Sequence, residues 1–220
     1  HVQREAYEKH CSGIAIDKRG VGVSDKPEGP YTSADMASDA RAVMDHLDLE
    51  KAHIAGISMG GAIAQELYLQ APERVRSLVL VSTFSRLSAY QAMVFEHFKS
   101  VHRHCAPDDF TRCLQLWIWS ESYYASNGND LAIARRQGPM NPTPKPHYAF
   151  DAQCDACITH DAHARLNEIA VPTLVTVGSK DIFTPPALSD EIIAAIKGSR
   201  LEVFEGSGHT HHWEQVERFN

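Results

Sequence analysis

Short apolar runs alternate along this chain with segments whose apolar residues recur at helical spacing. Most of the runs are rich in valine, isoleucine and leucine and lack a clean polar alternation, which is typical of parallel strands covered on both faces. They comprise residues 13–17, 53–58, 77–83, 173–178 and 200–206. Strands that alternate with helices predict an α/β fold with a doubly wound, mostly parallel sheet and right-handed crossovers.

Three segments between the runs have the periodicity of amphipathic helices. The first, residues 33–47, follows Thr32, and Thr32 with Asp35 forms the start signal of a capping box. The other two helices are expected over residues 59–70 and 187–197. These helices would form the layers that cover a buried parallel sheet.

A long helical stretch, residues 84–169, interrupts the alternation of strands and helices. It is rich in Trp, Phe, Tyr and Met and lies between two expected strands. We therefore predict a helical cap inserted into an α/β core that consists of residues 1–83 and 170–220. The aromatic side chains of the cap are candidates for lining a substrate pocket, with packing between helices as the alternative for each.

Composition argues against a nucleic-acid-binding or membrane-spanning protein. The 220 residues are 43% hydrophobic and 22% charged, and the formal charge of −7 leaves no basic surplus for binding nucleic acid. No apolar run approaches the roughly 20 residues that cross a bilayer, and five cysteines without regular spacing fit a reduced chain. We expect a cytoplasmic globular protein that binds neither nucleic acid nor membrane, and self-association into a homo-oligomer stays open.

The sharpest chemical signal is GISMG at residues 56–60, placed between an expected strand and an expected helix. A G-x-S-x-G in this context is a nucleophile elbow, in which small residues permit a tight turn that raises the serine hydroxyl above the sheet edge. Ser58 is then a candidate nucleophile, and the amide of Met59 can donate to an oxyanion at the helix N-terminus. The alternative is a glycine-rich turn whose serine has no catalytic role.

A serine nucleophile needs a base that an acid orients, and the elbow predicts the order Ser, Asp or Glu, His. Asp181 follows the expected strand at 173–178, and His209 follows the one at 200–206. Both lie at carboxyl ends of strands, the edge at which open α/β sheets hold their sites. Asp181 and His209 are therefore the candidate acid and base, and a simple turn residue is the alternative for Asp181.

Two neighbouring histidines compete with His209 for the role of base. His209 is favoured because glycines at positions 206 and 208 allow its loop to bend toward Ser58. His211 and His212 are expected at the start of the terminal helix, where a two-histidine metal site is a minor alternative.

A Cys-x-x-Cys followed by two histidines is a further candidate metal site. Its residues are Cys154, Cys157, His160 and His163. The surrounding stretch has a helical pattern and no partner Cys-x-x-Cys occurs, so we prefer buried, unreactive cysteines and expect no metal.

Four segments resemble the α/β-hydrolase superfamily, and together they span nearly the whole chain. They are residues 16–27 (IDKRGVGVSDKP), similar to the D-x-R-G-x-G-x-S turn of that family, 56–82, 171–186 and 206–220. The resemblance implies that Ser58, Asp181 and His209 form a catalytic triad and that the Met59 amide belongs to an oxyanion hole. It also implies a structural role for the turn after residue 16, in which Arg19 holds loops together.

Two branches of the superfamily are most similar. The elbow and the Asp181 loop resemble 3-oxoadipate enol-lactonases and aminoacrylate hydrolases, which are small hydrolases. The tail, with Trp213 four residues after His209, is similar to meta-cleavage-product hydrolases, which break carbon–carbon bonds with the same triad. In that branch a tryptophan packs near the catalytic histidine, so Trp213 joins Trp117 and Trp119 as a candidate pocket residue, with coverage of the core as the alternative.

The chain departs from the family pattern at its start. Family members have three further strands upstream, and the loop after the third carries a His-Gly motif that supplies a second oxyanion amide. No His-Gly pair occurs in this sequence, which begins His1-Val2, and the last family helix is also shortened. We therefore expect the N-terminal strands to be missing from this chain, and loss of one oxyanion donor costs roughly 10²–10³ in rate.

The sequence therefore predicts a serine hydrolase that cleaves a small carboxylic ester or lactone through an acyl-enzyme on Ser58, without cofactor or metal. Its partner would be the small-molecule substrate. Two alternatives remain: a carbon–carbon bond hydrolase of the meta-cleavage-product type, and a truncated, non-catalytic hydrolase-like binding protein. Haloalkane dehalogenation is disfavoured because it needs a carboxylate where this chain has Ser58.

Overall fold

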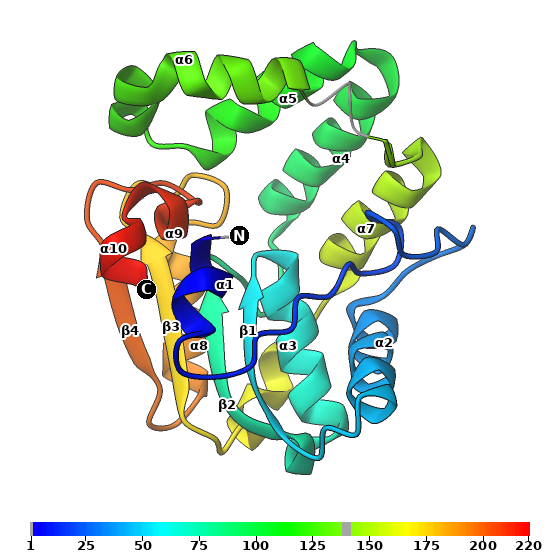
Figure 1. Cartoon of the computed structure of the whole chain (residues 1–220), viewed down its shortest axis with the longest axis vertical. Coiled ribbons are helices and arrows are strands. Elements are labelled where there is room, and N and C mark those ends of the chain that lie inside the picture. Colours follow the sequence, from blue (N-terminus) through cyan, green and yellow to red (C-terminus); the bar gives the residue numbers. More distant parts are fainter. Residues whose placement is uncertain (1, 138–141) are drawn as a thin grey trace.

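Four parallel strands form the sheet at the centre of the protein. The computed structural model describes residues 2–137 and 142–220, and Figure 1 shows their arrangement. The strands are β1 (Ala52–Ile57), β2 (Val75–Val81), β3 (Thr173–Gly178) and β4 (Arg200–Phe204), which lie side by side in sequence order. All three pairings are parallel, with Val79 opposite Ala55 of β1 on one side and Leu174 of β3 on the other. The predicted parallel α/β sheet is confirmed.

Position in the sheet decides how much of each strand is buried. β2 and β3 lie in the middle, and most of their residues are buried or half-buried, as their content of valine and leucine predicts. β1 and β4 are the outer strands of the described sheet, and exposed residues alternate with less exposed ones along most of each. Ile57 at the end of β1 is 36% exposed. The expectation of strands covered on both faces therefore holds only for the centre of the sheet.

The run at residues 13–17 is not a strand, so that prediction is wrong. The segment has no regular secondary structure, and Ile14 and Ile16 are 51% and 44% exposed. An extended segment becomes a strand only when a neighbour takes up its backbone N–H and C=O groups. No strand in the described part of the chain pairs with this run. The apolar pattern of the run could not reveal that a partner is lacking.

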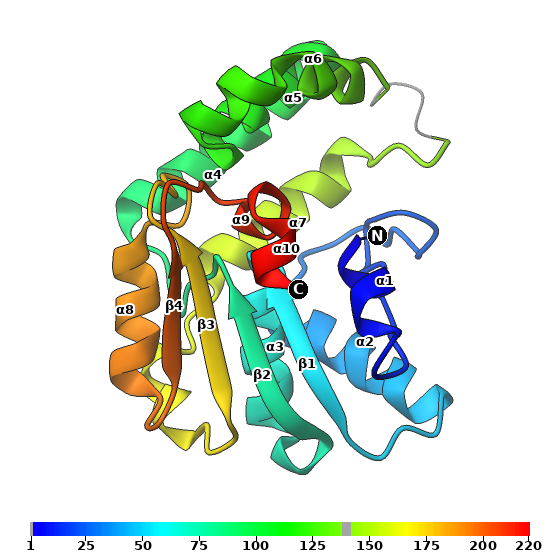
Figure 2. The same cartoon turned by 60° about the vertical axis from the view of Figure 1, so that its left-hand side comes forward.

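Helices flank the sheet. α3 (Met59–Gln70) packs on β1 and β2, α8 (Pro186–Ala195) packs on β3 and β4, and α2 (Ser33–His46) packs on α3 (Figure 2). The Thr32–Asp35 capping box is present at the start of α2, as predicted. The three predicted helices are confirmed to within a few residues. Among the residues that the structure describes, no helix is both long enough and apolar enough to cross a membrane.

Arg19 ties the turn after residue 16 to α2. Its Nε donates to Asp39 Oδ2 at 2.6 Å and its Nη2 donates to Asp39 Oδ1 at 2.7 Å. Such bidentate pairs fix geometry as well as adding energy. The structural role that the family resemblance implies for Arg19 is therefore consistent with its contacts.

Four helices between β2 and β3 lie above the carboxyl ends of the strands (Figures 1 and 2). They are α4 (Ala89–His104), α5 (Pro107–Ile118), α6 (Glu121–Gln137) and α7 (His147–Thr159). α7 packs on α4, and its buried alanines also join an apolar cluster with Tyr31 and Met36. The helical character predicted for this part of the chain is confirmed, whereas its division into a cap over residues 84–169 and a separate core stays a prediction.

The chain ends in two short helices near the carboxyl ends of the strands (Figure 2). α9 (His211–Glu214) and α10 (Val216–Phe219) are separated by Gln215, whose backbone at φ −127° and ψ 56° is not helical. The terminal helix expected from the sequence is therefore broken. α1 (Val2–Tyr7) meets this end of the chain through Gln3, whose Nε2 donates to the carbonyl of His212 at 2.6 Å.

The largest apolar cluster lies between the sheet and the helices α2, α3 and α8. Its fully buried members include Leu67, Leu78, Val175 and Ile192. Burying side chains of this size stabilises a fold by about 1.5–3 kcal/mol each. The cluster holds the strands in register and thereby fixes the relative positions of the loops at their carboxyl ends. The remaining described elements are two 3₁₀ helices, Pro72–Arg74 and His163–Glu168.

Candidate active site

Ser58 lies at the sharp turn between β1 and α3. Its backbone adopts φ 54° and ψ −119°, in the left-handed region that residues other than glycine rarely occupy. Its N–H donates to the carbonyl of Val81 at 2.8 Å, and its own carbonyl accepts from Thr83 Oγ1 at 2.7 Å. These bonds hold the strained turn in the geometry expected of a nucleophile elbow.

Gly56 is the glycine on which this turn depends. A Cβ at Gly56 would lie 2.1 Å from the carbonyl oxygen of Gly60, whereas a Cβ at Gly60 would meet nothing within 4 Å. We expect Gly56→Ala to lower the free energy of unfolding by about 3 kcal/mol or more, because backbone atoms cannot move aside without opening the elbow. Urea unfolding followed by circular dichroism measures the change.

Gly60→Ala is the matched control for this prediction. It adds the same methyl group inside α3, where alanine is favoured over glycine by about 0.5–1 kcal/mol. Its free energy of unfolding should equal or exceed that of the wild type. Equal stabilities for the Gly56 and Gly60 variants would contradict the close packing at Gly56.

Asp181 and His209 lie beside each other at the carboxyl ends of β3 and β4. His209 Nδ1 is 2.9 Å from Asp181 Oδ2, and both residues are almost completely buried. Asp181 also accepts from the N–H groups of Phe183 and Thr184, each at 2.9 Å, and from Thr184 Oγ1 at 2.8 Å. The carboxylate is therefore fully hydrogen-bonded, and it orients the imidazole so that Nε2 is left for a second partner.

The charge of Asp181 is stabilised by these contacts. Burial alone would raise the pKa of the carboxyl group, but the charge of His209 and the hydrogen bonds from His209 and Thr184 outweigh burial and hold the pKa below its usual value. Asp181 thus stays ionised at neutral pH, and it can stabilise a positive charge on His209.

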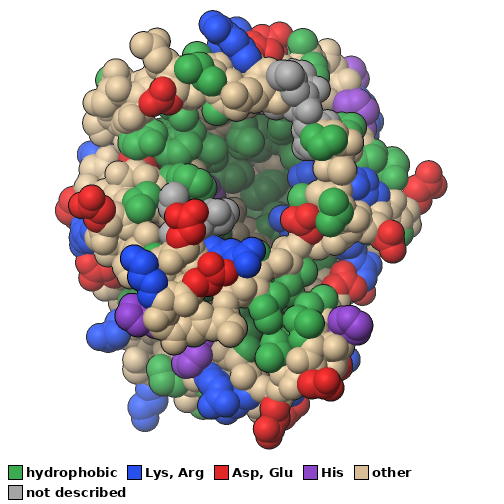
Figure 3. Space-filling view, viewed as in Figure 1, with side chains coloured by type: hydrophobic (Ala, Val, Ile, Leu, Met, Phe, Trp, Pro, Cys, Tyr) green, Lys and Arg blue, Asp and Glu red, His purple; other side chains and the backbone are tan. Residues whose placement is uncertain are grey.

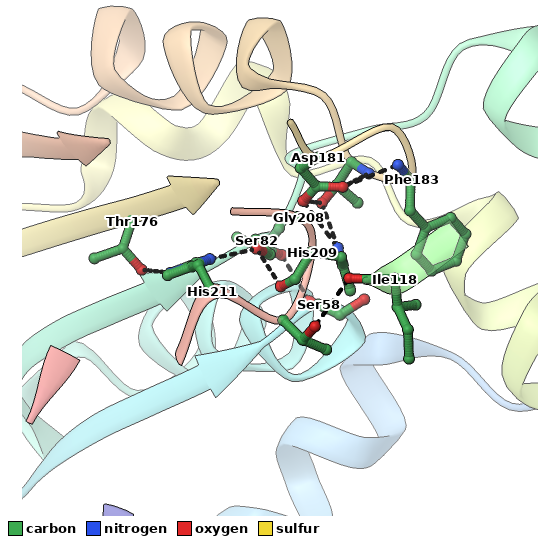
Figure 4. A network of polar contacts seen from close by, with 12 residues as sticks. Ser58, Ser82, Ile118, Thr176, Asp181, Phe183, Gly208, His209 and His211 are labelled. Carbon is green, nitrogen blue, oxygen red and sulfur yellow. Dashed lines mark hydrogen bonds and ion pairs between the residues drawn. The ribbon is translucent and has the colours of Figure 1, made fainter. Parts of the chain in front are cut away.

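Ser58 and His209 are held by consecutive residues at the end of β2. Val81 bonds to the N–H of Ser58, Ser82 Oγ donates to the carbonyl of His209 at 2.9 Å, and Thr83 bonds to the carbonyl of Ser58. Figure 4 shows Ser58 and His209 close together, with Asp181 on the far side of His209. Hydrogen bonds between a nucleophile and its base often tighten only when substrate binds. The structure therefore brings the three side chains singled out from the sequence to one edge of the sheet.

Met59 is the first residue of α3. The first N–H groups of a helix lack acceptors within the helix and lie at the positive end of its dipole. The amide of Met59 is thus placed to donate to an oxyanion that forms at Ser58, and this role stays a prediction. Its side chain packs against the apolar clusters that contain Phe84 and Met36.

Glu214 ties the loop of His209 to the junction of α5 and α6. Its carboxylate accepts from Ser120 N at 2.9 Å, from Ser120 Oγ at 2.6 Å and from Gly208 N at 3.1 Å. Thr210 adds bonds from its N–H and its Oγ1 to the carbonyl of Ile118, at 3.1 and 2.9 Å. Glu214 was not predicted from the sequence, because no local pattern shows that the junction of α5 and α6 lies near it.

A cavity of about 790 Å³ lies between α5 and α6 on one side and the loop of Asp181 on the other. Its lining includes Trp119, Ser120 and Tyr124, together with Asp181 and Ile182, whereas Ser58 and His209 are not part of it. Figure 3 shows that the molecule is hollowed beneath the cap helices, with hydrophobic side chains around the hollow. Cavities of this size and character suit a small-molecule ligand.

Two of the three tryptophans named as candidate pocket residues lie near the site. Trp119 lines the cavity and stacks on Tyr123 with ring centroids 4.6 Å apart. Trp117 packs on Phe183, whose ring lies 4.9 Å from that of His209. Phe183 was not predicted as a neighbour of the base, although an aromatic residue two positions after Asp181 was a usable signal.

Trp213 does not line the cavity beneath α5 and α6, and its role as a pocket residue stays a prediction. It is 38% exposed and lines a separate depression together with residues 214–218. His211 and His212 are both buried. Because successive residues of a helix point in different directions, burying these two histidines turns Trp213 outward.

The residues of the candidate metal site have separate environments. Cys154 and Cys157 are buried in the apolar cluster around Phe84, and burial raises the pKa of Cys157 to about 12. His160 and His163 each contact a different serine through Nδ1. Within residues 2–137 and 142–220, no group of three or more His, Cys, Asp or Glu side chains is arranged to hold a metal.

Three buried histidines make the fold sensitive to acid. Burial lowers the pKa of His211 to about 3 and the pKa values of His160 and His212 to about 4. Between pH 6.5 and 4 the unfolded chain therefore binds protons that the native state does not, and the free energy of unfolding falls as pH falls. Each histidine contributes a slope that approaches about 1.4 kcal/mol per pH unit. Urea unfolding at intervals from pH 8 to 5 measures the combined slope.

His160→Asn and His46→Asn separate this effect from general acid sensitivity. His160 is 4% exposed, whereas His46 is an exposed residue at the end of α2. Removing the buried histidine should flatten the dependence of stability on pH, and removing the exposed one should not. An unchanged slope in His160→Asn would rule out His160 as a source of the acid sensitivity.

Comparison with known proteins finds relatives over nearly the whole chain. A family model described as the alpha/beta hydrolase fold matches residues 1–216. One relative, from Azorhizobium caulinodans, carries the provisional name carbamate hydrolase RutD. It is 29% identical over 208 residues, which are 94% of this chain and 77% of that protein. The 3-oxoadipate enol-lactonase 2 of Acinetobacter baylyi is 29% identical over 213 residues, 94% of this chain and 75% of that protein.

Solved structures agree with these relatives. The enol-lactonase from Burkholderia xenovorans LB400 has a TM-score of 0.88 at 25% identity, covering 99% of this chain and 81% of that one. A thermophilic esterase from Thermogutta terrifontis has a TM-score of 0.86 at 26% identity, covering 99% and 79%. With a family model that matches residues 1–216 and a parallel sheet that carries a strained serine at its edge, this chain belongs to the α/β-hydrolase fold family.

Proposed function

We propose that this protein is a serine hydrolase that cleaves a small carboxylic ester or lactone through an acyl-enzyme on Ser58. The observation that carries the proposal is the buried pair of Asp181 and His209, 2.9 Å apart, at the strand edge where Ser58 occupies its strained turn. The relatives named as enol-lactonases and as an esterase support this class of substrate.

The proposed reaction has two halves. His209 Nε2 takes the proton of Ser58 as Oγ attacks the carbonyl carbon, Asp181 stabilises the imidazolium, and the Met59 N–H donates to the oxyanion. Collapse of the intermediate breaks the bond to the alkoxy oxygen, which receives the proton from His209. A water molecule then attacks the acyl-enzyme with His209 as base, and the carboxylic acid and Ser58 are released.

A fluorophosphonate probe with p-nitrophenyl acetate tests the proposal. We expect stoichiometric labelling of the folded protein on the peptide that contains Ser58, and turnover of the ester that labelling abolishes. A protein that folds but takes up no label and turns over no ester would support the non-catalytic alternative instead.

Substrate panels separate the remaining enzymatic alternatives. The carbon–carbon hydrolase hypothesis drew on Trp213, which is exposed and lies outside the cavity. Turnover of esters and lactones without cleavage of a dienoate ring-fission product would exclude that alternative. Because one relative carries a carbamate hydrolase name, an aryl carbamate belongs in the same panel.

A further inference from the structure

A second buried polar chain lies behind His209, on the side away from Asp181 (Figure 4). His211 Nε2 is 2.9 Å from Thr176 Oγ1, and His211 Nδ1 is 3.2 Å from Ser82 Oγ. Ser82 Oγ in turn donates to the backbone carbonyl of His209 at 2.9 Å. Ser82 and His211 are completely buried, and Thr176 is 2% exposed. None of these three side chains takes part in the reaction steps proposed above.

If all of these hydrogen bonds are made, the hydrogen atoms of Thr176, His211 and Ser82 can be arranged in only one way. A carbonyl oxygen only accepts, so the hydroxyl hydrogen of Ser82 points at His209. Ser82 Oγ must then accept from His211, which places a hydrogen on Nδ1. Burial lowers the pKa of His211 to about 3, so the ring is neutral and its Nε2 must accept from the hydroxyl of Thr176. The donors therefore run in order from Thr176 to His211, to Ser82 and to His209.

This series of hydrogen bonds ends beside the residue that holds the backbone of Ser58. Ser82 follows directly on Val81, the residue whose carbonyl holds the N–H of Ser58. Ser82 has φ 44°, a left-handed conformation that costs free energy and is found where the surroundings demand it. Its N–H donates to the carbonyl of Thr176 at 2.8 Å, so its backbone and its side chain are both held. A bond from Ser82 to the carbonyl of His209 thus sets the base relative to Ser58.

We propose that Ser82 and His211 are positioning residues for His209, and that they hold its backbone at the height from which its imidazole reaches Ser58. The inference rests on the proposed function, since it assigns His209 the role of base. Misplacing a catalytic group by about 1 Å costs up to roughly 10²-fold in rate. The effect should fall on kcat rather than KM, because both side chains are completely buried and cannot touch a substrate.

Two substitutions at His211 separate positioning from simple stability. In His211→Asn the side-chain amide lies near the former Nδ1 and can still donate to Ser82, whereas in His211→Gln the amide oxygen lies near the former Nε2 and can still accept from Thr176. Each variant keeps one of the two bonds, so their melting temperatures should be similar. We expect the Asn variant to lose at most a few-fold in kcat for p-nitrophenyl acetate. The Gln variant and Ser82→Ala should lose roughly 10- to 100-fold with KM unchanged.

Equal kcat values for the Asn and Gln variants, or wild-type kcat in Ser82→Ala, would overturn the proposal. If the variants do not fold, nitrogen NMR of the wild-type protein decides it, since His211 should be neutral with its hydrogen on Nδ1. A hydrogen on Nε2 of His211 would also overturn it. Failure of the proposed function is distinguishable, because the wild type would then take up no fluorophosphonate while the NMR result stands by itself.

Discussion

Ser58→Ala is expected to lower kcat for p-nitrophenyl acetate by about 10⁵- to 10⁶-fold, because no acyl-enzyme can form without the hydroxyl. The residual rate would come from substrate binding and the oxyanion amide alone. KM should change little, since the hydroxyl contributes its bond in the transition state rather than in the ground state. The backbone bonds to Val81 and Thr83 do not involve the side chain, so the fold should persist. Stopped-flow measurement of the burst of p-nitrophenol gives both the acylation rate and the number of active sites.

Ser189→Ala is the matched control for the loss of a serine hydroxyl. Ser189 is completely buried in α8, and its Oγ has no hydrogen-bond partner among the described residues. Its replacement should leave kcat and the melting temperature near their wild-type values. A Ser58→Ala protein that folds and keeps more than about 1% of wild-type kcat would contradict the role of Ser58 as nucleophile, because a residual of that size is far above what triad deletions leave.

Asp181→Asn is expected to lower kcat by about 10⁴-fold with little loss of structure. The amide cannot accept from every donor that now surrounds the carboxylate, and it favours the imidazole tautomer that presents a hydrogen rather than a lone pair to Ser58. A large loss should be found both at pH 8 and at pH 5. The pKa of Asp181 is held below its usual value, so the wild-type carboxylate stays ionised over this range and its contribution is lost only at lower pH. Steady-state kinetics at both pH values measure the two losses.

Asp190→Asn makes the same change of charge on the exposed surface of α8. Its kcat should match the wild type, which separates a local role of the carboxylate from the net charge of the chain. A loss in Asp181→Asn of less than about tenfold would show that Asp181 does not orient the base, since orientation of the imidazole accounts for most of the expected 10⁴-fold effect.

Much of the fold follows from local sequence patterns. The central strands β2 and β3 are rich in valine and leucine, and α2 begins at a capping box that is visible as Thr32 and Asp35. In both cases the signal and the structure lie within the same few residues. The candidate site could be predicted for the same reason. Ser58, Asp181 and His209 each come shortly after a strand, and the carboxyl ends of parallel strands lie at one edge of the sheet.

Features that depend on distant neighbours were not predictable in this way. The run at 13–17 has the composition of a strand but no described partner, so Ile14 and Ile16 stay exposed. Trp213 has the spacing of a pocket residue, yet burial of the two histidines before it turns it outward. The bond between Ser120 and Glu214 joins residues 94 positions apart, and neither has a local signature.

By itself, therefore, the sequence determined the parallel α/β fold, the elbow at Ser58 and the candidate acid and base. These depend on periodicity and on the order of elements, which short-range patterns encode. Only the tertiary structure decided which apolar residues are buried, how Glu214 joins the junction of α5 and α6 to the loop of His209, and how Thr176, His211 and Ser82 line up behind the base. Such contacts arise when segments far apart in the chain pack together, and their direction is set by hydrogen-bond donors and acceptors that meet only in the folded protein.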